Sequence, residues 1–171
     1  MTDSAVLESV VRRVIQNVLD REGGIANVGD GEGVTRFGQT AQWLRQWRLP
    51  PPNTRDEAAM NYRSWIERVN LDVLCTADDQ LPDIVIDFAV HSGERVAIAA
   101  LQRAIGLKAD GVIGPKTMTA VQTADRRHLA HWVIAERLEL DNGLITDHPD
   151  DFARFARGWA RRLGAQIRGL A

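Results

Sequence analysis

A single glutamate at the end of an apolar helical stripe is the residue of this sequence best suited to acid chemistry. Val11, Ile15 and Val18 follow one another at spacings of three and four, and the next place on that stripe is Glu22. Burial against apolar groups raises the pKa of a carboxyl group, because the charged form loses its water. A carboxylic acid that keeps its proton near neutral pH can act as a general acid at a glycosidic bond. The alternative is a glutamate that faces solvent where the helix ends.

Such chemistry needs a second carboxylate nearby, and the glycine-rich segment after Glu22 offers two. Asp30 lies eight positions after Glu22, and Glu32 lies ten positions after it. Either can act as a base for water or stabilise an oxocarbenium-like transition state, and Thr35 is a candidate for holding the water. Asp30 is the preferred candidate, although Gly29-Asp30-Gly31 also suits a tight turn. Glu32 is the second candidate, with plain solvation as its alternative.

Length and composition are those of an ordinary globular chain. The 171 residues suffice for one domain, or for one domain with a small appendage. Apolar residues make up 44% and charged residues 26%, which argues against disorder as the main state. One cysteine excludes an internal disulfide framework and a sulfur-rich zinc cluster. The net charge of −2 disfavours a nucleic-acid binder, and no apolar run is long enough for stable membrane insertion.

The apolar spacing predicts helices in the first half of the chain, interrupted once. The first helix stops at Gly23-Gly24, and a short hairpin is expected near residues 25–38, where glycines are dense. A short helix capped by Thr40 follows and is ended by Pro50-Pro51-Pro52. Thr54-Arg55-Asp56-Glu57 has the spacing of a capping box and begins the next helix.

The second half of the chain follows an acidic connection and is also helical in pattern. The expected helices run from Pro82 to Gly93, from Glu94 to Gly106, from Pro115 to Ala124, over about 129–138, and from Pro149 to Ile167. Residues 151–171 are basic, which suits anionic polymers or, as the preferred interpretation, a solvated face. The sequence therefore predicts an all-α fold of about seven helices.

Short motifs occur in a fixed order along the chain. In the first half they are Glu22-Gly23-Gly24, Gly33-Val34-Thr35, Phe37-Gly38-Gln39-Thr40, and the group Glu57, Ala58 and Tyr62. In the second half they are Asp87 to Gly93, Leu101-Gln102-Arg103-Ala104, and Asp110 to Thr117. This ordered set resembles glycoside hydrolase family 108. The last two motifs resemble the predicted peptidoglycan-binding region of that family.

The resemblance implies a lysozyme-like N-acetylmuramidase of phage endolysins and related secretion-activator proteins. Such an enzyme hydrolyses the β-1,4 bond between N-acetylmuramic acid and N-acetylglucosamine, and the family's catalytic acid falls on Glu22. We expect a catalytic part in residues 1–80 and a peptidoglycan-binding part in residues 81–171, packed as one compact unit. The chain departs from the family pattern at four positions. Ile25 stands where an aromatic residue is usual and Glu32 where Gly is usual. Gln39 replaces the usual Ile, and His91 stands where Asn is common. These departures bear on loop geometry and on which carboxylate assists.

Several other side chains are weighed against structural roles. The candidates for substrate contact are Trp43, Tyr62, His91 and Asp110. Trp43 and Trp47 can stack on a sugar ring, but their helical spacing favours the core. Asp110 with Gly111 suits a wall-binding loop and, equally, a plain turn. The tryptophans assigned to the core outright are Trp65, Trp132 and Trp159, and Cys75 is expected to be a buried apolar group.

Metal binding and cofactors are not expected. His128 and His131 stand three apart on a predicted helix, but no third ligand is placed by the sequence, and catalytic zinc needs three. The resembling family requires no metal or organic cofactor.

On this resemblance we expect a monomeric peptidoglycan hydrolase acting on glycan strands. One alternative is a lytic transglycosylase, which uses one glutamate and cyclises the muramyl product. Another is a non-catalytic wall-binding or secretion-helper protein, and a DNA-binding protein is a distant third. No secretory signal is readable. We therefore expect synthesis in the cytoplasm and action on the cell wall, in the periplasm, after release through a holin or an export system.

Overall fold

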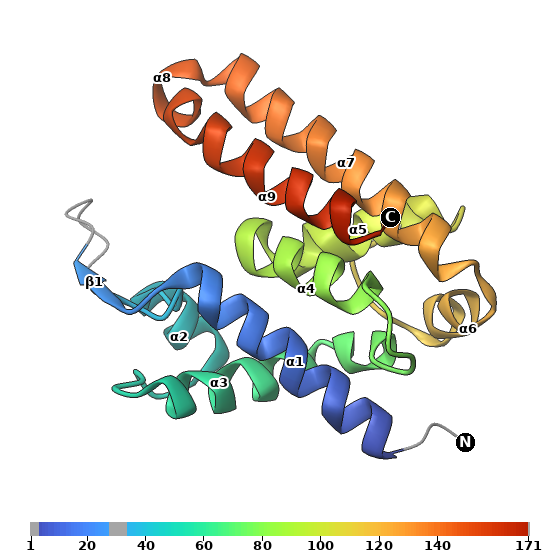
Figure 1. Ribbon diagram of the computed structural model, residues 1–171, viewed down its shortest axis with the longest axis horizontal. Coiled ribbons are helices and arrows are strands. Elements are labelled where there is room, and N and C mark those ends of the chain that lie inside the picture. Colours follow the sequence, from blue (N-terminus) through green and yellow to red (C-terminus); the bar gives the residue numbers. More distant parts are fainter. Residues whose placement is uncertain (1–3, 28–33, 171) are drawn as a thin grey trace. The chain divides into compact units, whose positions relative to one another are not determined.

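The computed structural model describes residues 4–27 and 34–170, which are mainly helical (Figure 1). They belong to two compact units, Met1–Asp78 and Asp79–Ala171. The all-α, lysozyme-like class predicted from the sequence is confirmed, including the small hairpin. The functional division into residues 1–80 and 81–171, and their packing as one compact unit, stay predictions.

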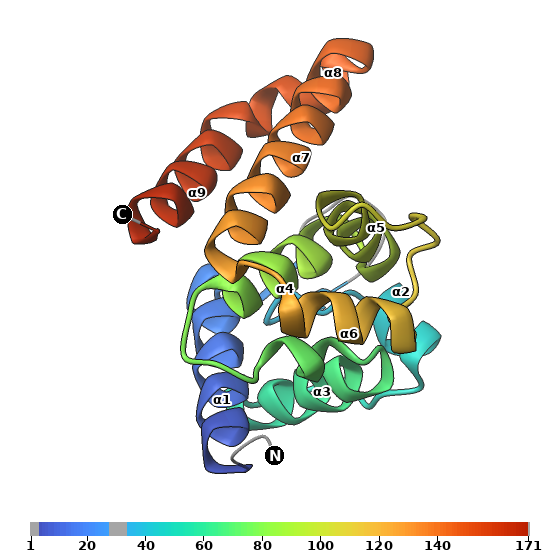
Figure 2. The same cartoon turned by 90° about the vertical axis from the view of Figure 1, so that its right-hand side faces the viewer.

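The first unit combines helices with one antiparallel hairpin. Its elements are α1 (Ser4–Glu22), β1 (Ile25–Asn27), β2 (Val34–Arg36), α2 (Ala41–Trp47), α3 (Arg55–Arg68) and a 3-10 turn, η1 (Leu71–Leu74). Helices α1 and α3 lie side by side (Figures 1 and 2). The faces that they bury include Val14, Val18 and Leu19 of α1 and Tyr62, Trp65 and Ile66 of α3. The same apolar stripe that predicted α1 therefore forms the core of this unit.

The predicted caps fix the starts of the two following helices. The Thr40 side chain accepts a hydrogen bond from the Trp43 amide at 3.1 Å, and Thr54 accepts one from the Glu57 amide at 3.2 Å. The Glu57 carboxylate accepts a hydrogen bond from the Asn53 amide at 2.6 Å. In a standard capping box that bond would come from the amide of the cap residue, here Thr54, so it falls one residue earlier.

In the second unit, every element among the described residues is a helix or a 3-10 turn. Its elements are α4 (Leu81–Ser92), α5 (Glu94–Ala104), α6 (Pro115–Thr123), α7 (Arg126–Asp147), α8 (Pro149–Phe152), a 3-10 turn η2 (Ala153–Phe155), and α9 (Ala156–Gly169). Helix α4 packs against α5 and α7, and α9 runs back beside α7 (Figures 1 and 2). Eight of the twelve residues of α4 are buried, which makes it the centre of this unit.

Two predictions for this unit are corrected by the structure. Trp132 was assigned to the core, but it is 49% exposed, because α7 buries the opposite face through Leu129, Val133 and Ile134. The single helix expected from Pro149 to Ile167 is divided by η2. The tighter 3-10 turn brings residues three apart onto one side, so the rings of Phe152 and Phe155 both lie 5.9 Å from that of Trp159.

Two of the other three residues assigned to the core are buried in the structure. Trp65 and Cys75 are fully buried, as predicted. Trp159, which was also assigned to the core, is only half-buried, because it packs within the aromatic cluster of α8 and α9 and not in the centre of the unit.

The acidic connection is held by arginines from distant parts of the chain. Asp78 pairs with Arg13 in the first unit. In the second unit Asp79 pairs with Arg126, and the Asp87 carboxylate lies 2.7 Å from the Arg137 guanidinium. Three carboxylates of this acidic stretch are therefore paired with arginines of their own unit.

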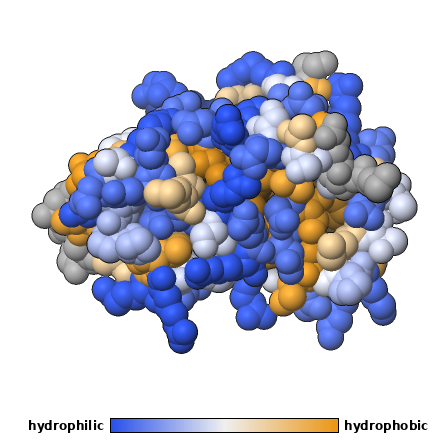
Figure 3. Space-filling model, turned by 90° about the horizontal axis from the view of Figure 1, so that it is seen from below, coloured by the Kyte–Doolittle hydropathy of each residue, from blue (hydrophilic) through white to orange (hydrophobic). Residues whose placement is uncertain are grey.

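The surface is mixed in polarity. On the face shown in Figure 3, hydrophilic side chains predominate and hydrophobic groups appear between them. Among the described residues, no helix is long and apolar enough to cross a membrane.

Candidate active site

Glu22 is the last residue of α1, and the chain turns immediately after it. Gly23 takes a left-handed φ of +72°, which a glycine adopts without strain and which ends a helix. The position follows the buried stripe through Ile15 and Val18, and Glu22 itself is half-buried. The sequence interpretation of Glu22 as the polar end of an apolar face therefore fits its place in the structure.

The hairpin begins directly beyond this turn. Its register pairs Ile25 with Arg36, Ala26 with Thr35, and Asn27 with Val34. The Phe37 amide then donates a hydrogen bond to the Gly24 carbonyl at 3.0 Å and closes the base of the hairpin. Thr35, the candidate for holding water, lies on the returning strand. The two candidate carboxylates, Asp30 and Glu32, lie outside the described residues.

Gly38, in the turn that follows β2, lies against Glu22. An added Cβ on Gly38 would lie 2.7 Å from Glu22 Cγ and 2.8 Å from the Tyr62 hydroxyl oxygen. Gly38 also has a left-handed φ of +80°. Only glycine meets both conditions without a shift of its neighbours. The glycine of the Phe37-Gly38-Gln39-Thr40 motif therefore allows the strand, the catalytic candidate and α3 to meet at one point.

Tyr62 supports this meeting point from α3. Its side chain is 2% exposed, and its hydroxyl donates a hydrogen bond to the Phe37 carbonyl at 3.0 Å. Burial raises the pKa of Tyr62 well above its usual range, and the nearby negative charge of Glu22 raises it further. The phenol is therefore a neutral donor that fixes the turn beside Glu22. A contact of Tyr62 with substrate stays a prediction.

An aromatic group surrounds Tyr62. The ring centroid of Trp43 lies 5.7 Å from that of Tyr62 and 5.8 Å from that of Trp65. Trp43 is half-buried, so part of its ring remains accessible beside the site. This is compatible with either of its two sequence interpretations, core packing or stacking on a sugar.

A buried polar pair that sequence reasoning did not identify joins the hairpin to α3. The Gln39 side chain is 1% exposed and donates to the Ala58 carbonyl at 2.9 Å. Asn61 in turn donates to the Gln39 side-chain oxygen at 2.8 Å and to the Pro50 carbonyl at 2.9 Å. Gln39 was noted as a departure from the usual Ile. The structure explains how this polar residue is accommodated, since burying an amide is tolerable when its hydrogen bonds are made.

The arrangement can present one carboxyl group in a fixed position. Glu22 is carried by the end of a packed helix, and the turn at Gly38 and the phenol of Tyr62 lie against its side chain. A group held in this way is suited to proton transfer to a bound ligand, because little reorganisation is needed at the moment of reaction.

Of the remaining site candidates, His91 lies on α4 in the second unit. It is half-buried, with its ring centroid 5.3 Å from that of Trp159. Burial lowers the pKa of His91 to about 4, assisted by the positive charges of Arg137 and Arg162. His91 is therefore uncharged at neutral pH. Its contact with substrate stays a prediction.

Asp110 lies in an exposed loop of the same unit and has a structural role there. Its carboxylate accepts hydrogen bonds from Gln102 at 2.8 Å and from the Val112 amide at 3.0 Å. The Gln102 hydrogen bond, followed by that of the Val112 amide, lowers the pKa of Asp110. The Gln102 side chain also accepts a bond from the Gly111 amide at 2.9 Å. The Asp-Gly motif is thus organised by a buried glutamine, and binding of wall polymer by this loop stays a prediction.

The histidine pair on α7 is engaged locally. His128 accepts a hydrogen bond from the Trp132 indole at 2.6 Å, and a His131 ring nitrogen lies 2.8 Å from the Arg127 carbonyl oxygen. Within residues 4–27 and 34–170, no group of three or more His, Cys, Asp or Glu side chains is placed to hold a metal ion.

Comparisons with known proteins place the second half of the chain in a cell-wall context. Residues 96–164 match the family model described as "Predicted Peptidoglycan domain". Among solved structures, the chain resembles SagA of Brucella abortus, with a TM-score of 0.77, 28% sequence identity and coverage of 95% of each chain. Among curated proteins, none matches this sequence. The match to a peptidoglycan domain supports peptidoglycan as a partner.

Proposed function

We propose that this protein is a peptidoglycan hydrolase, an N-acetylmuramidase related to glycoside hydrolase family 108, with Glu22 as its general acid. The main structural support for this proposal is the contact point at Gly38, where the end of the hairpin, Glu22 and Tyr62 meet. The match of residues 96–164 to a peptidoglycan domain supplies the substrate class. The ordered motifs around Glu22 supply the reaction class.

In the proposed mechanism Glu22 donates its proton to the oxygen that links N-acetylmuramic acid to N-acetylglucosamine. The bond between that oxygen and the anomeric carbon breaks through an oxocarbenium-like transition state. A water molecule then adds to the anomeric carbon and gives up a proton to a carboxylate. Asp30 is the preferred carboxylate and Glu32 the second candidate. Carboxyl groups about 5 Å apart would give retention of configuration, and a separation of roughly 6.5–9.5 Å would give inversion.

Tyr62 is a positioning residue in this proposal. It holds the Phe37 carbonyl and so keeps Gly38 against the side chain of Glu22. We also propose that the enzyme reaches the wall through an export or lysis system.

The test is digestion of purified peptidoglycan by the wild type and by Glu22→Gln, with products identified by mass spectrometry. Glutamine has nearly the size of glutamate but carries no acidic proton, so we expect a loss of at least about 100-fold in rate. The matched control is Glu67→Gln, because Glu67 is an exposed residue of the same unit that pairs with Arg63 at 3.1 Å. The control is expected to keep its activity.

The products separate the competing functions. Reducing products that end in muramic acid, formed by the wild type and lost in Glu22→Gln, would support the muramidase. Products lighter by one water would indicate a lytic transglycosylase. Wild-type protein that binds sacculi but releases nothing from several wall types would contradict the proposal and leave a binding protein.

A further inference from the structure

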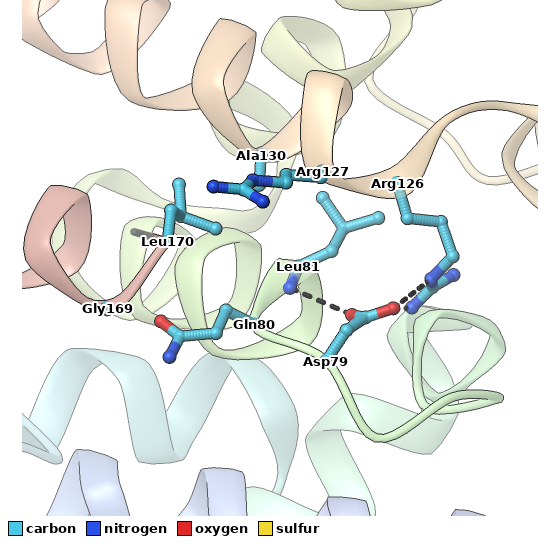
Figure 4. Close-up of a pocket in the computed structure, with 8 residues that line it drawn as sticks. All are labelled: Asp79, Gln80, Leu81, Arg126, Arg127, Ala130, Gly169 and Leu170. Carbon is cyan, nitrogen blue, oxygen red and sulfur yellow. Dashed lines mark hydrogen bonds and ion pairs between the residues drawn. The ribbon is translucent and has the colours of Figure 1, made fainter.

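A small cavity in the second unit is lined by none of the residues named for the candidate active site. It has a volume of about 180 Å³ and is formed where the start of α4, the start of α7 and the end of α9 meet (Figure 4). Leu81 lines it from α4 and Gln80 from the position just before that helix. Arg127 and Ala130 line it from α7, and Leu170 follows the last residue of α9. Three segments distant in the sequence thus build one concave site.

The interior of the cavity is apolar and small. Leu81, Ala130 and Leu170 are all buried and supply its apolar walls. A cavity of roughly 150 Å³ admits a molecule the size of benzene, whereas sites for drug-sized ligands measure about 300–1,000 Å³. The cavity therefore has room for one small end group and not for a disaccharide.

The polar groups around the cavity favour an anion. Asp79 also lines it, but its carboxylate is neutralised by an ion pair with Arg126 and accepts the Leu81 amide at 3.0 Å. The second guanidinium, on Arg127, is exposed and lies beside Ala130 in Figure 4. The net charge of these three side chains is positive. A carboxylate is the natural partner of such a guanidinium, because two N–H groups can bind its two oxygens together.

Gln80 adds a neutral donor and acceptor at the mouth of the cavity. Its side chain is exposed, and its carboxamide lies close to Gly169. An added Cβ on Gly169 would collide with that carboxamide, so the glycine leaves room for it. A carboxamide at this place can pair with a peptide group, which also has one donor and one acceptor.

We propose that this cavity binds the free C-terminus of a peptide ending in alanine, as the stem peptides of peptidoglycan do. The terminal carboxylate binds Arg127, the methyl group enters the apolar interior, and the last peptide group pairs with Gln80. The identity of the ligand rests on the proposed cell-wall function, because the cavity itself selects only a small apolar residue with a carboxylate. The site would direct the enzyme to strands whose stem peptides retain that end.

In the experiment, the full chain is titrated with Nα,Nε-diacetyl-L-lysyl-D-alanyl-D-alanine and, separately, with the C-terminal amide of that peptide. Binding is measured by calorimetry and by the NMR shifts of the protein's backbone N–H groups. The free acid is expected to bind and to shift residues around the cavity. The amide lacks the negative charge and is expected to bind the wild type at least about tenfold more weakly than the acid does. The acid is expected to bind Arg127→Gln at least about tenfold more weakly than it binds the wild type. Arg157→Gln is the matched control, because Arg157 is an exposed arginine of the same unit outside the cavity.

A second variant tests the cavity without changing the charge of Arg127. Gly169→Ala displaces only the flexible end of Gln80, so it is expected to weaken the acid severalfold while the circular dichroism spectrum is kept. Equal binding of acid and amide, unchanged binding by Arg127→Gln, or NMR shifts that avoid the cavity would each overturn the proposal.

Failure of this inference can be told apart from failure of the proposed function. Glu22→Gln is expected to bind the peptide as the wild type does, since Glu22 belongs to the other unit. Wild-type protein that cleaves peptidoglycan without binding the peptide would refute the cavity assignment alone. Protein that binds the peptide without cleaving peptidoglycan would refute the muramidase alone.

Discussion

At the scale of single residues, the site depends on Gly38 having no side chain. Because Gly38 has no Cβ, the turn after β2 can approach Glu22 and Tyr62 so closely that a methyl group would not fit between them. Tyr62 uses the same proximity to hold the Phe37 carbonyl. The motif around Gly38 is therefore explained by its packing against Glu22. Its residues position the Glu22 side chain and take no direct part in the proposed reaction.

Gly38→Ala is expected to destabilise the protein by about 1–3 kcal/mol, because the added Cβ overlaps two neighbours at a left-handed φ. Hydrolysis of peptidoglycan should fall further than stability alone explains, since Glu22 is displaced. Urea unfolding and the digestion assay check both effects. Gly106→Ala is the control, because Gly106 has a φ of +70° but no atom within 4 Å of an added Cβ. Equal losses in the two variants would show that backbone strain, and not the contact with Glu22, is responsible.

Tyr62 makes a second prediction possible because it is the only tyrosine of the chain. In the folded protein its pKa lies well above the usual value of about 10, whereas the unfolded chain ionises near that value. Above about pH 10 the unfolded state therefore releases a proton that the folded state keeps, and stability falls as pH rises.

Absorbance of the phenolate near 295 nm should stay absent until the protein unfolds, and the two transitions should coincide. Tyr62→Phe removes the signal and serves as the control for it. Ionisation near pH 10 in protein that remains folded would contradict the buried position of the phenol.

At the scale of elements, the second unit is joined by a buried charge. Arg137 of α7 is fully buried and lies 2.7 Å from the Asp87 carboxylate of α4. Gln166 of α9 donates to the same carboxylate at 3.0 Å. Three helices therefore share one hydrogen-bonded centre. Burying an ion pair costs desolvation, so removal of Arg137 takes away the nearest compensation for the Asp87 charge, whereas Arg162 lies 3.8 Å from the same carboxylate.

Arg137→Ala is expected to cost about 3–5 kcal/mol in the free energy of unfolding, because the buried Asp87 would lose its nearest guanidinium, at 2.7 Å, whereas that of Arg162 lies 3.8 Å away. The matched control is Arg103→Ala, which removes a more exposed pair with Glu136 and should cost less than about 1 kcal/mol. Urea unfolding followed by circular dichroism measures both. A cost near that of the control would mean that water reaches Asp87 and that the centre is not buried in solution.

At the scale of the whole molecule, the division between Asp78 and Asp79 separates the two proposed activities. The proposed acid Glu22 lies in the first unit, whereas the matched peptidoglycan domain and the cavity at Arg127 lie in the second. Each unit has its own buried residues, and a chain of about 90 residues can bury enough apolar surface to fold.

Residues 79–171 expressed alone are therefore expected to fold cooperatively and to bind sacculi without releasing products. Circular dichroism during thermal unfolding and a co-sedimentation assay check this, with the full chain as the comparison. A non-cooperative melt of the fragment would show that the second unit requires the first for folding. Release of products by the fragment would contradict the assignment of the acid to Glu22.

Much of the helical architecture could be predicted from the sequence, because its causes are local. The stripe from Val11 to Glu22, the stop at Gly23 and the caps Thr40 and Thr54 each act within a few residues. Trp132 was misplaced because hydrophobicity alone does not say which face of a long helix is covered. The face of α7 that carries Val133 and Arg137 is buried by α4, α5 and α9, which only their packing decides.

The sequence by itself determined that Glu22 ends an apolar helical face before a glycine-rich hairpin, since periodicity and glycine conformation are properties of neighbouring residues. Only the tertiary structure decided what meets Glu22. Gly38 and Tyr62 converge there from separate elements, the pair of Gln39 and Asn61 joins the segment after the hairpin to α3, and the cavity at Arg127 likewise draws on three segments. The physical reason is that burial and hydrogen bonding between distant residues depend on packing, for which no spacing along the chain is a signal.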